Sequence, residues 1–389
     1  MTQKYISTGY IENIGVFFES NFETIPQSIP PHSEGNRFNT LAQLGTTCEN
    51  EGEIAPHDMP TLTPVTRKEQ TRTLEKRAKS KYFSHSFAKQ LLKASGGRGP
   101  LSNAYRRTIQ CSGEILVGPD GRAVAHYCKN RWCVVCNRIR TAVTLKKYAP
   151  MLGQWQDAYF VTLTVRNVTG NELPTTVRAM TDTIQRIASR LKKRAQRGQC
   201  QKFVGIRKFE CTANAVRDDF HPHFHFIVRG EAMAHALRRA WLNEFVGHVY
   251  SEAQDVRKAD TGSIQELFKY ASKLVVKINR QTGRGVYADM QNVVFESIRG
   301  MRTLQSFGFK LPAINESELH IEGNAHIEGA MPNAFFMYEH HVANWVEVET
   351  GELLLPSWSL PESIRQLSEN IIVNPDYRRN GNRTFSGRG

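Results

Sequence analysis

The segment from His221 to Val228 carries three histidines at alternate positions in an otherwise apolar run. Side chains of a strand alternate between its two faces, so His221, His223 and His225 share one face if this run is a strand. Pro222 has no backbone N–H to donate and suits the first residue of a strand. His223 and His225 on one face can bind a divalent metal ion. The alternative is a row of stacked surface histidines, which suits so apolar a segment less well.

The charge of the chain indicates an anionic partner. Lysine and arginine number 51, and aspartate and glutamate 37, among 389 residues, which leaves a formal charge of +14. Residues 1–64 hold two basic and eight acidic side chains, for −6, so the remainder carries +20. The positive charge beyond residue 64 favours a nucleic acid as the partner.

The sequence contains no sign of membrane insertion or secretion. No apolar run approaches the length of a membrane span, and the first 25 residues lack the pattern of a secretory signal. We therefore expect a cytoplasmic protein with no membrane partner. Seven cysteines, three of them within nine residues, indicate metal binding in a reducing compartment rather than disulfides.

The length suits two or three domains, and shifts in composition predict four segments. Residues 1–64 are polar and acidic, which is typical of a mostly disordered head. Residues 65–150 are expected to form a basic helical and four-cysteine zinc module, and residues 151–312 the domain that contains the histidine strand. Residues 313–389 are predicted to be a C-terminal appendage that ends in a flexible basic tail.

Four cysteines are spaced to bind a structural zinc ion. Cys133 and Cys136 are separated by two residues, as in many tetrahedral sites, and Cys111 and Cys128 would complete an all-thiolate set. The alternative is a group of buried free cysteines. Zinc would hold together a loop-rich module whose basic side chains could contact DNA phosphates, namely Lys129, Arg131, Arg138 and Arg140.

Beyond the cysteines, segments of strand and helix periodicity alternate. Strands are predicted at 160–165, 203–212, 223–228 and about 249–256, and helices at about 174–194 and 231–246. This order predicts an α+β fold with a ferredoxin-like antiparallel sheet and flanking helices. The strand that carries Glu210 would lie beside the histidine strand, so Glu210, His223 and His225 can converge on one ion. A further strand is predicted at 293–297.

A helix predicted over 263–278 has one apolar and one polar stripe. Glu266, Tyr270 and Lys273 fall on the polar stripe at spacings of four and three residues, so they would be neighbours on the helix surface. The alternative is an ordinary amphipathic helix with two side-chain pairs.

A tyrosine beside a metal ion could attack a phosphodiester. Its hydroxyl is a weak nucleophile at neutral pH, and a divalent ion would polarise a phosphoryl oxygen and hold the phosphate in line. Lys273 could hold the phosphate or favour the ionised phenol, and Glu266 could take the proton or position a water molecule. Mixed nitrogen and oxygen ligands suit Mn²⁺ or Mg²⁺, whereas four thiolates prefer Zn²⁺.

Three of these segments, 160–165, 221–225 and 266–273, resemble the three motifs of the rolling-circle replication initiators. These are the Rep proteins of small bacterial plasmids, within the HUH endonuclease superfamily. The segment from Cys111 to Arg138 also resembles the cysteine-rich part of that family, although Val134 stands where a proline is often found. The resemblance covers roughly residues 105–310.

The resemblance implies a bacterial, metal-dependent nicking enzyme of the single-tyrosine type. Tyr270 would be the nucleophile, and His223 and His225 would bind Mg²⁺ or Mn²⁺. Glu210 would be the third ligand, with His221 as its competitor. The product would be a 5′-phosphotyrosine linkage and a free 3′-hydroxyl, which a later strand attack can rejoin.

The resemblance also implies a role for Glu266 and a set of partners. Glu266 would activate water to end replication after one round. The expected partners are a double-strand DNA origin, its single-stranded nick site, and a host helicase and DNA polymerase, and a homodimer is also considered. Two other functions stay open, a transposase with the same nuclease core and a zinc-stapled DNA-binding repressor without nuclease activity.

Overall fold

The computed structural model describes residues 67–118, 122–268, 286–310, 325–326 and 334–373. The predicted acidic head, Tyr270, Lys273 and the basic C-terminal tail therefore lie outside the described residues. No helix in the described part of the chain is both long and apolar enough to cross a membrane.

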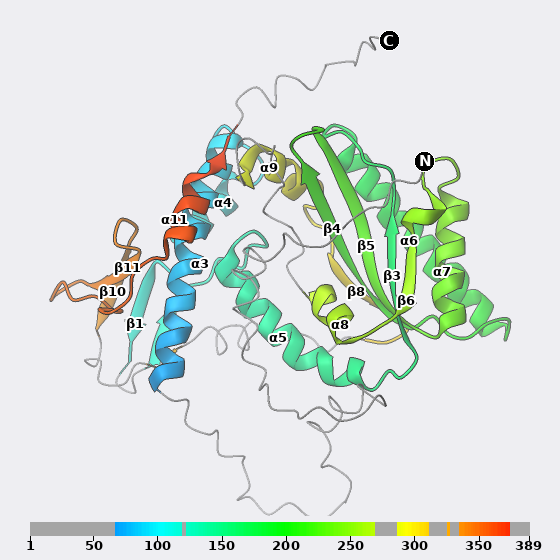
Figure 1. Cartoon of the computed structure of the whole chain (residues 1–389), viewed down its shortest axis with the longest axis horizontal. Helices are drawn as coiled ribbons and strands as arrows, with labels where there is room; N and C mark the ends of the chain where they lie inside the picture. Colours follow the sequence, from blue (N-terminus) through cyan, green and yellow to red (C-terminus); the bar gives the residue numbers. More distant parts are fainter. Residues whose placement is uncertain (1–66, 119–121, 269–285, 311–324, 327–333, 374–389) are drawn as a thin grey trace, which may run out of the picture. The chain divides into compact units, whose positions relative to one another are not determined.

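A five-stranded antiparallel sheet forms the centre of the predicted nicking domain (Figure 1). Its elements follow in the order β3 (Ala158–Thr164), α6 (Leu173–Gln196), β4 (Gly205–Asn214), β5 (Asp219–Arg229), α7 (Glu231–Glu244) and β6 (Asp255–Lys258). The strands lie in the order β6-β3-β5-β4-β8, with β8 (Leu304–Phe307) at the edge beside β4. The predicted antiparallel ferredoxin-like sheet is thus confirmed, and β8 extends it.

Alternation along the strands separates the two faces of this sheet. Phe224 points to the face covered by α6 and α7, where its ring lies 6.0 Å from the ring of Trp241. Ile227 points to the other face, and it packs in the core there with its cross-strand partners Phe160 and Ile206. That core also contains buried side chains of α5 (Val134–Gly153) and α8 (Thr261–Phe268). The histidines share the parity of Ile227 and lie on the α8 face.

A second five-stranded sheet joins segments that are far apart in the sequence. Its strands lie in the order β11-β10-β1-β2-β9. Strands β1 (Glu114–Val117) and β2 (Arg122–Ala125) lie near the cysteines, whereas β9 (Ala325–His326), β10 (Phe335–Glu339) and β11 (Asn344–Glu347) come from the predicted C-terminal appendage. The buried Trp345 donates from its indole N–H to the carbonyl of Ser112 at 2.8 Å. The C-terminal segment therefore completes the sheet that adjoins the cysteines.

Helices surround this second sheet and the cysteines. The helical part predicted for the basic segment consists of two helices, α3 (Arg67–Ala94) and α4 (Ser102–Gln110). Buried Leu74 and Ala78 of α3 pack with Ile115, Val117 and Phe336 of the second sheet. Helix α11 (Glu362–Glu369) contacts α3, and the short β12 (Ile371–Ile372) pairs in parallel with β7 (Val286–Tyr287).

The strand predicted at 293–297 is wrong, because these residues belong to helix α9 (Ala288–Ser297). Val294 and Phe295 are β-favouring residues, but both are buried where α9 contacts α3 and α6. Tertiary packing therefore overrides local propensity here. The strand predicted at about 249–256 begins later, at Asp255, after a 3₁₀ turn at Ser251–Ala253.

Candidate metal centres and active site

Strand register places a carboxylate directly opposite a histidine. Glu210 of β4 pairs with His223 of β5, and Lys208 pairs with His225. On the other side of β5, Thr164 and Thr162 of β3 pair with the same two histidines. The central strands thus present acidic, basic and imidazole groups together on the α8 face.

Three side chains on this face have the geometry of a metal centre. Oε2 of Glu210 lies 3.5 Å from Nε2 of His223 and 3.7 Å from Nε2 of His225. The ligand atoms of all three lie within 4.8 Å of one another. Ligands about 2.1 Å from a shared ion are separated by about 3.0–3.4 Å in octahedral and tetrahedral arrangements. The donor set therefore fits one divalent cation after a small contraction.

Hydrogen bonds on the far side of each imidazole orient the rings. Nδ1 of His223 lies 3.0 Å from the carbonyl oxygen of His221, to which it can donate. Nδ1 of His225 lies 3.2 Å from Oγ1 of Thr162. With each Nδ1 engaged, both Nε2 atoms are left to face Glu210. Partners of this kind hold metal-binding histidines in a fixed tautomer and direction.

His221 contacts a different group. Its Nε2 hydrogen-bonds Oγ1 of Thr164, and its ring stacks on that of His223 with centroids 5.0 Å apart. The donor set that the structure brings together contains Glu210 and lacks His221.

Burial and neighbouring charges set the ionisation of this centre. Burial alone would raise the pKa of Glu210, but Lys208 and the imidazoles of His223 and His225 hold that pKa well below its usual range. Nζ of Lys208 is 2.5 Å from Oε1 of Glu210, and both side chains are buried. Burial lowers the pKa of His225, while Glu210 partly offsets this effect. The carboxylate is therefore ionised and the His225 ring neutral near neutral pH, as cation binding requires.

Helix α8 brings one further predicted site residue close to this centre. Asp260 precedes the helix, and its Oδ1 accepts from the N–H and the hydroxyl of Ser263, both at 2.7 Å. Glu266 is half-buried, and its carbonyl oxygen accepts a hydrogen bond of 2.9 Å from Nζ of Lys208. Tyr270 and Lys273 follow in the sequence but lie outside the described residues. Lys208 was not predicted from the sequence, although its place two residues before Glu210 puts both on one strand face.

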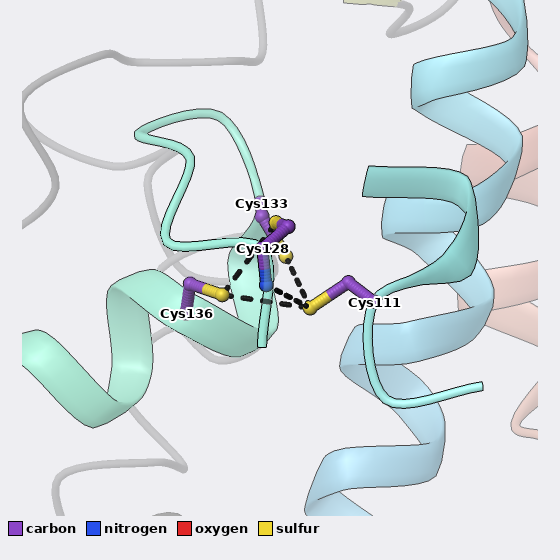
Figure 2. A group of neighbouring side chains, drawn as sticks. All are labelled: Cys111, Cys128, Cys133 and Cys136. Atoms are coloured by element: carbon purple, nitrogen blue, oxygen red, sulfur yellow. Dashed lines mark hydrogen bonds between the residues drawn. The ribbon is translucent and has the colours of Figure 1, made fainter. Parts of the chain in front are cut away.

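The four predicted cysteines form a compact cluster (Figure 2). Sγ of Cys111 lies 3.5 Å from that of Cys136 and 3.6 Å from that of Cys133, and the Cys128 and Cys136 sulfurs are 3.6 Å apart. Four sulfurs about 2.3 Å from a zinc ion would be separated by about 3.8 Å in a tetrahedron. The cluster therefore fits a tetrahedral zinc ion.

The surroundings of the cluster suit bound thiolates. The backbone N–H of Lys129 donates to Sγ of Cys136 at 3.2 Å, and that of Cys128 donates to Sγ of Cys111 at 3.4 Å. Burial raises the pKa of Cys133, so a bound cation would be needed to keep this thiol ionised. Buried Lys81 supplies positive charge nearby: burial lowers its pKa, and Cys111, Cys133 and Cys128 oppose that effect.

All three arginines that were predicted to contact DNA donate hydrogen bonds to oxygen atoms within the protein. Arg131 donates to the carbonyl oxygens of Ile298 at 3.4 Å and Met301 at 2.5 Å. Arg140 donates to the carbonyl of Lys129 at 2.8 Å. Arg138 donates to the hydroxyl of Ser80 at 3.2 Å.

Comparison with known proteins relates a segment of the chain to a protein family. Residues 122–232 match the family described as replication protein. This segment is similar to the Rep replication-protein family. The matched segment contains Cys128, Cys133, Cys136 and the three residues of the Glu210 centre, and it ends before Glu266.

Two relatives extend the match. The chain is 25% identical over 203 residues to "Protein rep" of Streptococcus pneumoniae serotype 2. The aligned region covers 48% of this chain and 60% of the relative. It is 26% identical over 166 residues to "Protein rep" of Staphylococcus aureus, covering 38% of this chain and 70% of the relative. The chain thus spans less than two thirds of the first relative. No solved structure matches the chain significantly.

Proposed function

We propose that this chain initiates rolling-circle replication by nicking one DNA strand at an origin and later rejoining it. The observation that carries the proposal is the Glu210, His223 and His225 donor set inside the segment that matches the replication-protein family. The sequence resemblance of 266–273 to the tyrosine motif of rolling-circle initiators supports it.

In this proposal, Glu210, His223 and His225 hold Mg²⁺ or Mn²⁺. When bound, the ion supplies Lewis-acid stabilisation of the scissile phosphate. The oxygen of the Tyr270 side chain attacks the phosphorus, a P–O bond to tyrosine forms, and the bond to the 3′ oxygen breaks. The phenol proton leaves to a base such as Glu266, and the departing 3′ oxygen takes up a proton to become a free hydroxyl. Lys273 holds the phosphate, and Glu266 positions the water that ends replication.

The four-cysteine cluster has a structural role in this proposal. Zinc bound to Cys111, Cys128, Cys133 and Cys136 holds the start of α5 against α4 and β2. Positive charge around the cluster binds DNA phosphates, with Lys129 and Arg138 as contacts alongside Arg131 and Arg140. The origin, its single-stranded nick site, and a host helicase and polymerase are the partners.

A nicking assay tests the proposal directly. Full-length protein is incubated with a supercoiled plasmid that carries its own origin and with Mn²⁺, and open circles and protein-linked DNA ends are measured. Tyr270→Phe is expected to abolish both products, because the nucleophilic oxygen is removed. Tyr287→Phe, which changes a tyrosine in β7, serves as the matched control and should nick normally. Unchanged nicking by Tyr270→Phe would remove the assignment, and binding without nicking by every form would favour a repressor.

A further inference from the structure

Lys208 is a buried cation beside the Glu210 centre, and neither the sequence motifs nor the family match assigns it a role. It lies on β4 two residues before Glu210, so both side chains point to the α8 face. Only 3% of the Lys208 side chain and 1% of the Glu210 side chain are exposed. A buried ammonium group is costly unless it is well paired, so its two contacts define what it does.

The first contact is with one oxygen of the metal-binding carboxylate. Nζ of Lys208 lies 2.5 Å from Oε1 of Glu210. Oε2 is the oxygen that faces the two imidazoles, at 3.5 Å from His223 and 3.7 Å from His225. Lys208 thus holds one oxygen away from the centre and turns the other toward it. Outer partners of this kind orient a metal ligand before the ion arrives.

The second contact is with the backbone of helix α8. Nζ of Lys208 donates to the carbonyl oxygen of Glu266 at 2.9 Å. Glu266 lies in α8, two residues before Phe268, the last residue that the structure describes in this segment. Lys208 therefore ties β4 to α8 at Glu266, four residues before Tyr270 in the sequence.

We infer that Lys208 is a positioning residue that couples the metal centre to the segment carrying the nucleophile. One side chain orients the carboxylate that binds the ion and anchors the helix that leads to the attacking tyrosine. The inference rests on the proposed function for the role of Tyr270. The orientation of Glu210 can be tested without it.

The test compares full-length Lys208→Met with Lys202→Met, which removes an exposed lysine just before the same strand. Titration calorimetry with Mn²⁺ measures affinity. We expect Lys208→Met to bind Mn²⁺ about 10–100-fold more weakly, as loss of an outer partner of a metal ligand typically does. Lys202→Met should match the unaltered protein. Equal affinities for Lys208→Met and the unaltered protein would overturn the orientation role.

A double variant separates positioning from general stability. Glu210→Gln removes the group through which Lys208 acts on the ion, so adding Lys208→Met to Glu210→Gln should weaken Mn²⁺ binding no further. A full additional loss would contradict action through Glu210. If Lys208→Met does not fold, as judged by thermal unfolding, Lys208→Gln retains a donor and replaces it in every comparison.

Nicking at saturating Mn²⁺ tests the helix contact. We expect the rate constant for nicking by Lys208→Met to fall about tenfold or more while KM for plasmid changes little, because displacement of the nucleophile slows the chemical step. A normal rate would overturn the anchoring of α8. Failure of the unaltered protein to nick would instead overturn the proposed function, and the Mn²⁺ titrations would still decide the orientation of Glu210.

Discussion

Glu210 lies directly opposite His223 across the β4–β5 pair, with its Oε2 3.5 Å from the Nε2 of that histidine. His221, two residues earlier on β5, lies opposite Thr212 and contacts Thr164 instead. This register favours Glu210 over His221 as the third ligand. We therefore expect Glu210→Gln to weaken Mn²⁺ binding about 10–100-fold, as measured by calorimetry, because it removes a buried ligand charge with little change in shape. His221→Asn is the matched variant and should bind Mn²⁺ nearly normally, whereas the reverse ranking would make His221 the ligand.

The cysteine cluster predicts one zinc ion per chain. Purified protein should contain about one equivalent of zinc by elemental analysis, and Cys136→Ser should retain far less. Its melting temperature should fall, because the cluster lies between α4, β2 and α5. Cys200→Ser alters a cysteine outside the cluster and is the control. Equal zinc content in both variants would show that these cysteines are not the ligands.

The position of Lys81 predicts that its buried positive charge helps the cysteine cluster to retain zinc. An all-thiolate zinc site carries net negative charge, and Lys81 is buried close to it while donating to the carbonyl of Ile109 at 2.7 Å. Lys81→Met should lower zinc affinity about 10–100-fold in a chelator competition assay. Lys89→Met, which removes an exposed charge from the same helix, should have little effect. Identical zinc affinity in the two variants would show that Lys81 does not contribute to zinc binding.

Arg131 is predicted to stabilise the fold. Its guanidinium donates to the carbonyls of Ile298 and Met301, which follow α9. Arg131→Gln should lower the free energy of unfolding by about 1–3 kcal/mol in urea titrations, since charged hydrogen bonds are lost. The exposed Arg98→Gln is the control. Unchanged stability with weaker, less salt-dependent DNA binding would indicate that Arg131 acts only as a phosphate contact and does not stabilise the fold.

A half-buried histidine pair predicts sensitivity to acid. His85 of α3 stacks on His340 after β10, with ring centroids 4.4 Å apart. Burial lowers the pKa of His85 to about 3 and that of His340 to about 4, from 6.5. Below pH 6.5 the unfolded chain therefore binds more protons than the folded one, so the free energy of unfolding should fall as pH drops from 6.5 toward 4.

Urea unfolding at about pH 7.5 and about pH 5 measures this effect. His85→Phe keeps an aromatic ring that cannot be protonated, so it should lose less stability on acidification. His341→Asn changes the exposed neighbouring histidine and should behave as the unaltered protein. An undiminished pH dependence in His85→Phe would exclude the pair as its source.

Short-range periodicity in the sequence was sufficient to predict the local features of the site. Alternation along β5 places His223 and His225 on one face wherever the strand lies, and the order of strands and helices predicts the antiparallel sheet beside Glu210. The spacing of Cys128, Cys133 and Cys136 likewise predicts their cluster, since few residues separate them.

Features that depend on strand register and long-range packing could not be predicted from the sequence and are seen only in the folded structure. Whether Glu210 faces the imidazoles depends on how β4 is aligned with β5, and whether His221 meets Thr164 depends on how β3 is aligned with β5. Local patterns contain neither alignment. Packing against α3 and α6 makes α9 a helix despite its β-favouring residues. Lys208 meets Glu266 only when α8 folds onto β4, from 58 residues further along the chain. Such contacts depend on the whole fold, because each is formed by residues that have no local reason to meet.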